Sequence, residues 1–388
     1  MTMKCKSILI TNADAVNGGD AALVIGLYNK FEKNGFDVKV STFHYDQVKK
    51  IYPNINLTKS ILEDRILNFL LRRMKYISYL WIFLKLVFRG KSYKDADILV
   101  SAPGGYINSY YGFLGKLFSM VLAKKLYKKR IYMYSQSVGP LEINDEKIVK
   151  KYMKFFELFM VRDSISYKTL KEITLGQNII QTNDAAFLLD RINKNANEKK
   201  MKVAISVRGW KHDNRNKEKY INLIIQATQL CINNGYKVEF LSTCQGISGY
   251  VDDSIIAKEI VNKLNQEYID HVTVNDGVYS VYELRQYLTT FSFTIGTRLH
   301  MCILSMLSST PALNISYEVK GIECYRHLGL EKYSLDYNAD LEEVKNKLNN
   351  FIEELSYIEC LLPELMQKMN KEANEYFDMC INNIHKSK

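Results

Sequence analysis

Short apolar runs alternate with helical patterns along most of this chain, and this alternation constrains its fold more than any other feature. A parallel pair of strands needs a crossover connection, so strands that alternate with helices predict parallel sheets covered by helices. We therefore expect an α/β protein. The candidate strands are 7–10, 37–42, 97–101, 131–135, 158–161, 178–181, 202–207, 237–241, 272–274, 291–295 and 312–316.

The polar stretch 191–200 has no apolar periodicity and is the best linker in the chain. It divides the 388 residues into two Rossmann-like domains, 1–190 and 201–335, which a tail of helices, 340–388, follows. Two such domains that face each other across a cleft form a GT-B-like arrangement, whose cleft is lined by the carboxyl ends of both sheets.

The seven cysteines are scattered and form no C-x-x-C pair, which predicts reduced thiols and neither a disulfide framework nor a zinc site. Residues 1–10 run directly into a candidate strand without a cleavable apolar core, so we expect no secretion signal. Both observations favour a cytoplasmic protein. The six histidines show no metal-ligand spacing, and we expect neither a metal nor a cofactor.

A formal net charge of +11 indicates an anionic partner. Cations coincide with helically spaced apolar residues in the segment 66–90, whose longest charge-free stretch, 76–84, is far below the roughly 20 residues of a membrane-spanning helix. One interpretation is a peripheral helix on the inner face of the cell membrane, and the other is a core helix whose cations are solvated. No nucleic-acid-binding motif is present, so nucleic acid is not expected. The cations of the segment are Arg72, Arg73, Lys75, Lys85 and Arg89.

Arg298 and His300 follow the candidate strand 291–295, at a transition from strand to helix. Ligands bind at this edge of an open α/β sheet because backbone amides converge there. An anionic ligand and a proton transfer suit this pair. Residues two apart on a regular helix do not share a face, so the two can cooperate only if Arg298 still belongs to the turn. The alternative is a surface arginine beside a buried, hydrogen-bonded histidine.

Two further cations follow neighbouring strands of the same predicted sheet. Arg208 ends the strand 202–207, and Lys320 stands at the helix entry after the strand 312–316. Cations that converge with a histidine at one edge of a sheet require an anion to compensate their charge.

Three strand ends in the first half carry glycines or polar side chains. Asn17 and Asp20 follow the first strand, where we expect Asp20 to cap the next helix. Gly104 and Gly105 form a loop without G-x-G-x-x-G spacing, so no dinucleotide site is predicted. Gln136 and Ser137 are expected in a loop after the strand 131–135, where they could hold sugar hydroxyls. The alternative is that these residues form ordinary turns and helix caps, which the turn 17–20 favours when it is taken by itself.

Taken in order, these residues resemble the polysaccharide pyruvyl transferase family over roughly residues 12–325. Pro103 departs from the family pattern, because a third glycine is common at that position. The resemblance depends on the order and spacing of the whole set, since no single motif in it is specific. The set consists of Asn17, Gly19, Asp20, Ala22, Gly104, Gly105, 136–140, Arg162, Asp163, Ser164, Ser166, Asp184, Arg208, Arg298, His300, Tyr317 and Lys320.

The resemblance implies transfer of pyruvate from phosphoenolpyruvate to a sugar of a cell-surface glycan or its lipid-linked precursor, usually as a cyclic ketal, with release of phosphate. The donor side is then the domain 201–335. His300 is expected to act as the general acid, with Arg298 beside it in catalysis. Arg208, Arg298 and Lys320 are expected to bind the donor, because arginine forks suit carboxylates and phosphates.

The acceptor is expected on the first domain, 1–190. The candidate acceptor-binding residues are Asn17, Asp20, Gly104, Gly105, Gln136 and Ser137. Two alternatives stay open. One is a GT-B glycosyltransferase that uses a nucleotide sugar, since the same cationic cleft would serve a diphosphate. The other is a non-catalytic glycan-binding protein at the membrane surface.

Overall fold

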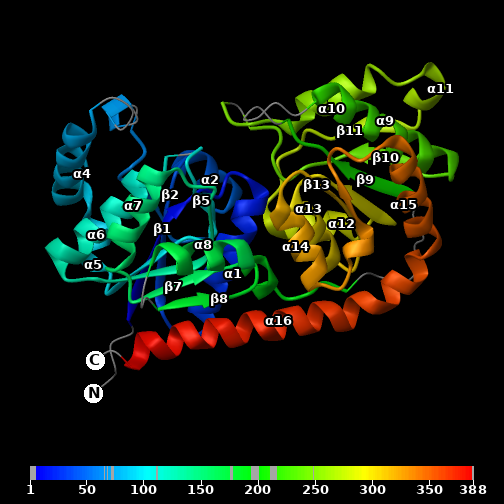
Figure 1. The fold of residues 1–388 in the computed structure, drawn as a ribbon. Helices are drawn as coiled ribbons and strands as arrows, with labels where there is room; N and C mark the ends of the chain where they lie inside the picture. Colours follow the sequence, from blue (N-terminus) through cyan, green and yellow to red (C-terminus); the bar gives the residue numbers. More distant parts are fainter. Residues whose placement is uncertain are drawn as a thin grey trace. The chain divides into compact units, whose positions relative to one another are not determined.

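The computed structural model describes residues 6–64, 66–67, 69–70, 74–110, 112–174, 178–193, 201–209, 216–247 and 249–386. Its internal contacts divide the chain into two compact units (Figure 1). Unit 1 contains Met1–Val16, Leu23–Leu188 and Glu372–Lys388, and unit 2 contains Asn17–Ala22 and Leu189–Lys371. Both units are parallel sheets with helices, which confirms the predicted α/β class.

Unit 1 is built on an eight-stranded parallel sheet in the order β3-β2-β1-β4-β6-β7-β8, with β5 paired to β6. Apolar runs such as β4 and β7 are buried along their whole length, as strands covered on both faces must be. The strands are β1 (Ser7–Ala13), β2 (Asp37–Thr42), β3 (Leu57–Lys59), β4 (Ile98–Ser101), β5 (Gly104–Ile107), β6 (Arg130–Val138), β7 (Leu158–Val161) and β8 (Ile179–Gln181).

The helices of unit 1 connect these strands. Asp163 caps α8 by accepting a hydrogen bond from the backbone N–H of Ser166 at 2.7 Å. The helices are α1 (Gly18–Lys33), whose first residues count with unit 2, α2 (Tyr45–Ile51), α4 (Lys75–Arg89), α5 (Lys91–Asp95), α6 (Leu114–Tyr127), α7 (Ile143–Met153), α8 (Ser164–Ile173) and the 3-10 helix η1 (Ala185–Leu188).

Unit 2 contains a six-stranded parallel sheet in the order β11-β10-β9-β12-β13-β14. This is the doubly wound Rossmann order. The first three strands are added towards one edge of the sheet and the last three towards the other, so the strand order reverses between β9 and β12. The strands are β9 (Lys202–Ser206), β10 (Lys237–Phe240), β11 (Val272–Val274), β12 (Phe293–Gly296), β13 (Ala312–Ser316) and β14 (Ser334–Asp336).

The helices of unit 2 begin with side-chain caps in several places. Asn216 caps α9, Asp252 caps α10, and Ser280 forms a reciprocal capping box with Glu283 at α12. The helices are α9 (Lys217–Asn233), α10 (Asp253–Val261), α11 (Gln266–Ile269), α12 (Val281–Leu288), α13 (Leu299–Leu307), α14 (Val319–His327), the 3-10 helix η2 (Glu331–Tyr333) and α15 (Leu341–Glu353).

The predicted C-terminal helices are present as α15 and the long α16 (Leu355–Lys386), the red helix of Figure 1. They do not form a unit of their own. Helix α15 belongs to unit 2, whereas α16 is divided, with the residues up to Lys371 in unit 2 and those from Glu372 in unit 1. In unit 1 the ring of Phe377 packs against Phe31 with ring centroids 5.1 Å apart.

The grouping of contacts differs from the predicted domain limits in a second place. The boundary lies between Leu188 and Leu189, but Asn17–Ala22 separate from the N-terminal unit and group with unit 2. Of the predicted linker, residues 194–200 lie outside the described ranges. Arg191 and Ile192 bond to unit 2, through Ser309 Oγ at 3.0 Å and the Leu307 carbonyl at 2.8 Å.

All eleven predicted strands are present, with small shifts at their ends, and three further strands were missed. The missed strands are β3, β5 and β14, with the sequences LTK, GGYI and SLD, which contain few of the apolar and β-branched residues that mark the predicted strands. Two loop predictions were wrong. Gly104 and Gly105 lie in β5, and Gln136 and Ser137 lie within β6, which continues to Val138.

Candidate active site

The two arginines expected at the donor site follow neighbouring strands of unit 2. β9 and β12 pair in parallel, with Ser206 opposite Gly296. Arg208 comes two residues after β9, and Arg298 comes two residues after β12. Both therefore start from the point at which the strand order reverses, which is where doubly wound sheets bind their ligands.

Tyr220, a buried residue of α9, connects these two strand ends. Its hydroxyl accepts a hydrogen bond of 3.1 Å from the backbone N–H of Arg208 and lies 2.8 Å from Thr297 Oγ1. Its ring stacks on that of Tyr337, with centroids 4.4 Å apart. Burial raises the pKa of Tyr220 above its usual value, so the phenol stays protonated and fixes both strand ends.

Arg298 is paired with Asp253, the first residue of α10. Its Nε and Nη2 each donate a hydrogen bond of 2.8 Å to one oxygen of the carboxylate. Asp253 is 1% exposed and also accepts a 2.6 Å bond from Ser242 Oγ. Burial disfavours the charged guanidinium, but the neighbouring Asp253 carboxylate outweighs burial and raises the pKa of Arg298 above its usual value.

This pair modifies the role expected for Arg298. Two parallel N–H groups of its guanidinium already hold Asp253, so they are not available to fork a donor carboxylate or phosphate. The hydrogen bonds that the Arg298 side chain makes within the described ranges all go to Asp253. Nη1 and the second hydrogen of Nη2 are the donors that a ligand could use.

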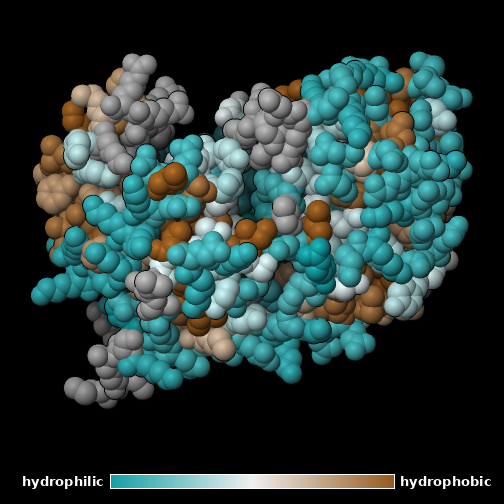
Figure 2. Space-filling view, viewed as in Figure 1, coloured by the Kyte–Doolittle hydropathy of each residue, from teal (hydrophilic) through white to brown (hydrophobic). Residues whose placement is uncertain are grey.

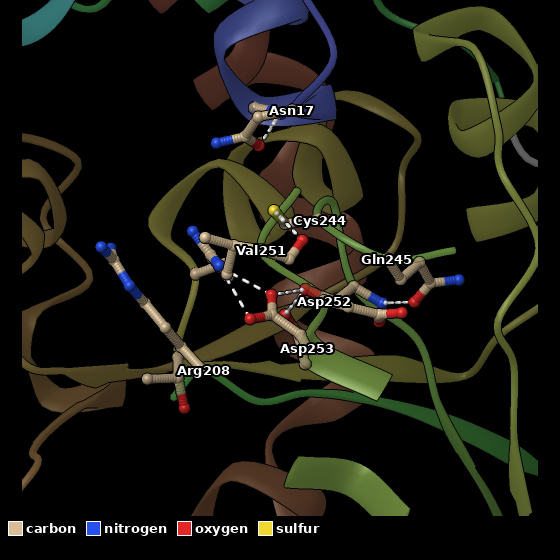
Figure 3. Close-up of polar contacts among 12 residues, drawn as sticks. Asn17, Arg208, Cys244, Gln245, Val251, Asp252 and Asp253 are labelled. Carbon is tan, nitrogen blue, oxygen red and sulfur yellow. Dashed lines mark hydrogen bonds and ion pairs between the residues drawn. The ribbon is translucent and has the colours of Figure 1, made fainter. Parts of the chain in front are cut away.

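Arg208 and Lys320 meet at one aromatic ring. The guanidinium of Arg208 lies over Tyr317, 4.5 Å from the ring centroid, and its Nη1 donates to the Tyr317 hydroxyl. Lys320 Nζ lies 6.0 Å from the same centroid and forms an ion pair with Glu318. Figure 3 shows the half-buried Arg208 side chain extending away from Asp253, so the two arginines are held by different partners.

His300 is the second residue of α13 and is half-buried. Arg298 is the residue before this helix and has an extended backbone, φ −83° and ψ 111°. The predicted condition for cooperation is therefore met, because Arg298 belongs to the turn and not to the helix. The side chain of Arg298, the N-cap residue of α13, accepts no hydrogen bond from the helix, and the N–H groups of the first turn form a positive end to which an anion can bind.

The glycine-containing turn 17–20 lies against His300. A methyl group placed on Gly19 would stand 2.9 Å from His300 Nδ1 and 3.0 Å from its Cβ, closer than real Cβ contacts come. The backbone N–H of Gly18 donates a 2.7 Å hydrogen bond to the Thr243 carbonyl. These contacts explain why the turn groups with unit 2, and any side chain at position 19 would force His300 to shift.

Asn17, and not Asp20, caps helix α1. Asn17 Oδ1 accepts a 3.0 Å hydrogen bond from the backbone N–H of Gly19, and its Nδ2 donates to Asp20 Oδ2 at 3.1 Å. The carboxylate of Asp20 instead lies near the ion pair of Arg298 and Asp253, and its negative charge helps to raise the pKa of Arg298. The predicted cap was one helical turn too late.

Four of the residues expected to bind the acceptor lie in unit 1. Gly104 pairs with Gln136 across β5 and β6. Ser137 Oγ donates to Asp163 Oδ2 at 2.7 Å and accepts from Arg162 Nε at 2.8 Å, so its hydroxyl is already engaged. The amide oxygen of Gln136 is buried and has no hydrogen-bond partner within the described part of the chain. Gly105 lies beside Gly104 in β5.

Several residues of the resemblance form one polar network in unit 1. Arg162 pairs with Asp184 at 2.8 Å, and both side chains are less than 10% exposed. Through Ser137 this pair reaches Asp163, which caps α8. The spacing of these residues is thus explained by the packing of β6, β7 and α8.

Asp253 and Tyr220 were missed by the sequence analysis. Asp253 opens a helix after the apolar strand β10, so paired acidic residues before that helix were a signal for it. Tyr220 is one of 27 tyrosines in the chain and lies among buried residues of α9, so no pattern singles it out. Within the described ranges, no group of three or more His, Cys, Asp or Glu side chains could hold a metal ion.

Comparison with known proteins gives one family. The family model described as polysaccharide pyruvyl transferase matches residues 17–319, which is most of the chain. The amylovoran biosynthesis protein AmsJ of Erwinia amylovora is 26% identical over 393 residues, covering 91% of this chain and 94% of AmsJ.

Solved structures show the same fold at low sequence identity. A glycosyltransferase from Rickettsia africae superposes with a TM-score of 0.66 at 10% identity, covering 99% of this chain and 100% of that chain. HepE from Anabaena, solved with UDP and glucose, gives a TM-score of 0.64 at 9% identity, covering 97% and 99%. This likeness confirms the expected GT-B-like fold class. At 9–10% identity it is evidence of a shared fold and not of a shared activity.

Proposed function

This chain belongs to the polysaccharide pyruvyl transferase family, and we propose that it moves pyruvate from phosphoenolpyruvate to a sugar of a cell-surface polysaccharide or its lipid-linked precursor. The product is a cyclic ketal, and phosphate is released. The relative AmsJ, a protein of amylovoran biosynthesis, supports a role in modifying an exopolysaccharide.

The observation that carries this proposal is the meeting of cations, a histidine and an uncapped helix end at one edge of unit 2. Phosphoenolpyruvate bears a carboxylate and a phosphate, so it needs several cationic or N–H donors at short range. Arg208 and Lys320 meet at Tyr317, and the first turn of α13 offers backbone N–H groups. We assign phosphate and carboxylate binding to these groups, with Nη1 of Arg298 as a further donor.

His300 is the proposed general acid. It protonates the methylene carbon C3 of phosphoenolpyruvate, which leaves a cationic centre at C2. The two acceptor hydroxyls form two C–O bonds at C2, and the bond from C2 to the phosphate oxygen breaks. The acceptor loses two protons, of which one balances the new C3–H bond and the other leaves on phosphate.

We place Asp20 and Asn17 on the acceptor hydroxyl that attacks near His300. The turn that carries them contacts the His300 ring through Gly19. A carboxylate accepts the hydrogen bond of an attacking hydroxyl and can take its proton as the C–O bond forms. This assignment predicts that Asp20→Asn lowers kcat with little change in KM for phosphoenolpyruvate.

The remaining acceptor contacts are proposed for Gln136, Gly104 and Gly105 of unit 1. The buried amide oxygen of Gln136 has no partner among the residues that the structure describes. Because Gln136 is 0% exposed, a sugar hydroxyl could bond this oxygen only after β5 or β6 shifts locally. Ser137 is less suited to this role, since its hydroxyl is bonded to Arg162 and Asp163. The reaction as proposed needs neither a metal nor a cofactor.

The direct test is incubation with phosphoenolpyruvate and a candidate acceptor glycan, followed by measurement of phosphate release. His300→Asn should abolish phosphate release while phosphoenolpyruvate binding is largely retained. His327→Asn, on the exposed end of α14, is the matched control and should behave as the wild type. Full turnover by His300→Asn would refute the assignment.

A nucleotide-sugar transferase is the second candidate, because the fold is that of glycosyltransferases and HepE was solved with UDP. Ligand binding to the native state raises the melting temperature, so the two donors can be told apart. Stabilisation by a nucleotide sugar and not by phosphoenolpyruvate would favour this candidate. A non-catalytic glycan-binding protein would bind glycan but release no phosphate with any donor.

A further inference from the structure

Helix α4 of unit 1 exposes an apolar stripe to solvent. The exposed residues recur at helical spacing, so that they share one face. The most exposed are Tyr76 at 88%, Phe88 at 79% and Leu80 at 58%. Exposed apolar side chains precede the helix as well, at positions 66, 69 and 74. The stripe on α4 consists of Tyr76, Ile77, Leu80, Phe83, Val87 and Phe88.

The opposite face of α4 is fixed against the body of unit 1. Ile82 and Leu86 belong to the buried core, and the Tyr127 hydroxyl of α6 donates to the Leu86 carbonyl at 3.0 Å. Lys85 also points inward and forms a 2.6 Å ion pair with Asp64. The helix therefore cannot turn its apolar stripe into the core without exposing this pair and the core residues.

A surface helix usually buries its apolar side chains and exposes polar and charged ones, whereas α4 buries apolar side chains on one face and exposes further apolar side chains on the other. The expectation of a core helix with solvated cations is thus wrong for Lys85, which is 10% exposed. Figure 2 shows apolar surface over α4, at the left edge of the view. Contiguous exposed apolar surface marks a site of interaction with a protein or a membrane.

The charge around the apolar stripe favours a membrane over a second copy of this chain as the partner. The sequence from Arg65 to Lys94 contains eight cationic residues and no acidic one. Among the described residues of this range, Arg89, Lys91 and Lys94 are exposed at and just beyond the end of α4. Arg65, Arg72 and Arg73 lie outside the described ranges. A second copy of this chain would bring the same cations against themselves, whereas anionic lipid headgroups complement them.

We propose that α4, with the exposed apolar residues before it, docks unit 1 onto a bilayer that contains anionic phospholipid. The apolar stripe enters the boundary between headgroups and acyl chains, and the flanking cations contact lipid phosphates. Among the described helices, none has the length and hydropathy that spanning a membrane requires. The inference is independent of pyruvyl transfer, because it concerns a surface of unit 1 and not the groups around His300.

Flotation with vesicles tests the proposal. The full chain should float with phosphatidylglycerol–phosphatidylcholine vesicles and bind vesicles of phosphatidylcholine alone much more weakly. The double variant Leu80→Ser/Phe88→Ser should lower binding to the anionic vesicles by about tenfold or more, because it removes two apolar side chains that would be buried in the bilayer. Ile143→Ser removes an apolar side chain of similar exposure, 73%, from α7 of the same unit and should leave binding unchanged.

A second variant tests the charge. Arg89→Gln/Lys91→Gln should weaken binding to anionic vesicles and reduce its dependence on salt. Equal binding to both kinds of vesicle, or binding that survives Leu80→Ser/Phe88→Ser, would overturn the proposal. So would concentration-dependent dimerisation that this double variant abolishes, if the wild type does not float with vesicles.

Discussion

The carboxylate of Asp253 holds Arg298 through two parallel hydrogen bonds of 2.8 Å, and both side chains are at least 90% buried. A buried pair of this geometry orients its arginine, since any other rotamer would leave a charge unpaired in the interior. One edge of the Arg298 guanidinium is thereby fixed, and its Nη1 takes no part in this pair.

Replacing Asp253 with asparagine should destabilise the protein by about 3 kcal/mol, because it leaves the buried guanidinium without a counter-charge. Urea unfolding measures this loss. The double variant Asp253→Asn/Arg298→Gln removes both charges and should be more stable than the sum of the single effects predicts. Strict additivity would show that the two side chains are not coupled.

Gly19→Ala should disturb His300 directly, because the new methyl group would lie 2.9 Å from its Nδ1. We expect kcat for phosphate release to fall by about tenfold or more, since small misplacements of a reacting group are costly. Gly209→Ala is a matched control, because a methyl group there meets no atom of the described residues within 4 Å. Equal rates for the two variants would show that His300 tolerates displacement.

Tyr220→Phe removes the hydroxyl that joins the ends of β9 and β12. We expect a loss of about 1–2 kcal/mol in stability and a raised KM for phosphoenolpyruvate, because Arg208 loses its backbone anchor. Tyr325→Phe removes another buried hydroxyl, which bonds the Ala312 carbonyl at 2.9 Å. It should cost similar stability without changing KM, and a KM shift in both variants would contradict a specific role for Tyr220.

The ion pair beneath α4 predicts a pH dependence of stability. Partial burial raises the pKa of Asp64, but hydrogen bonds from Lys85 and Trp81 outweigh burial and lower this pKa from 3.8 to about 2. A depressed folded-state pKa stabilises the protein above about pH 4, by about 2 kcal/mol, and this contribution disappears as the pH falls towards 2.

Asp64→Asn should therefore be less stable than the wild type near pH 6, and the gap should narrow as the pH falls below about 4. The free energy of unfolding, measured at several pH values for both proteins, checks this expectation. A gap that stays constant down to about pH 2.5 would mean that the variant acts through packing and not through ionisation.

Much of the fold could be predicted because apolar strands and amphipathic helices alternate so regularly. The predicted limits of β2, β7, β11 and β13 agree with the structure residue for residue. Strands without an apolar run escaped prediction. β5 reads GGYI, and glycine has little preference for strands, so only the pairing of β5 with β6 makes this segment a strand.

The site could be predicted in part for a similar reason. Residues just after parallel strands gather at one edge of a sheet, and this rule predicted that Arg208, Arg298 and His300 lie at the same edge of unit 2. The rule does not predict which side chain of a helix will pair with a residue at this edge. Asp253 therefore remained hidden, although it determines how Arg298 is oriented. The contact of Gly19 with His300 joins residues that are 281 positions apart in the sequence, and no local pattern predicts it.

The divided helix α16 affects how such proteins can be recombined. Its last residues pack on unit 1, where the guanidinium of Arg130 donates to the Ile384 carbonyl at 2.8 Å, although the strands of that unit end near residue 181. A chimera that joins the first half of one family member to the second half of another at the linker would separate unit 1 from its own residues 372–388. A compatible graft must carry 372–388 along with residues 1–188, and the turn 17–22 should match the recipient's histidine-bearing half.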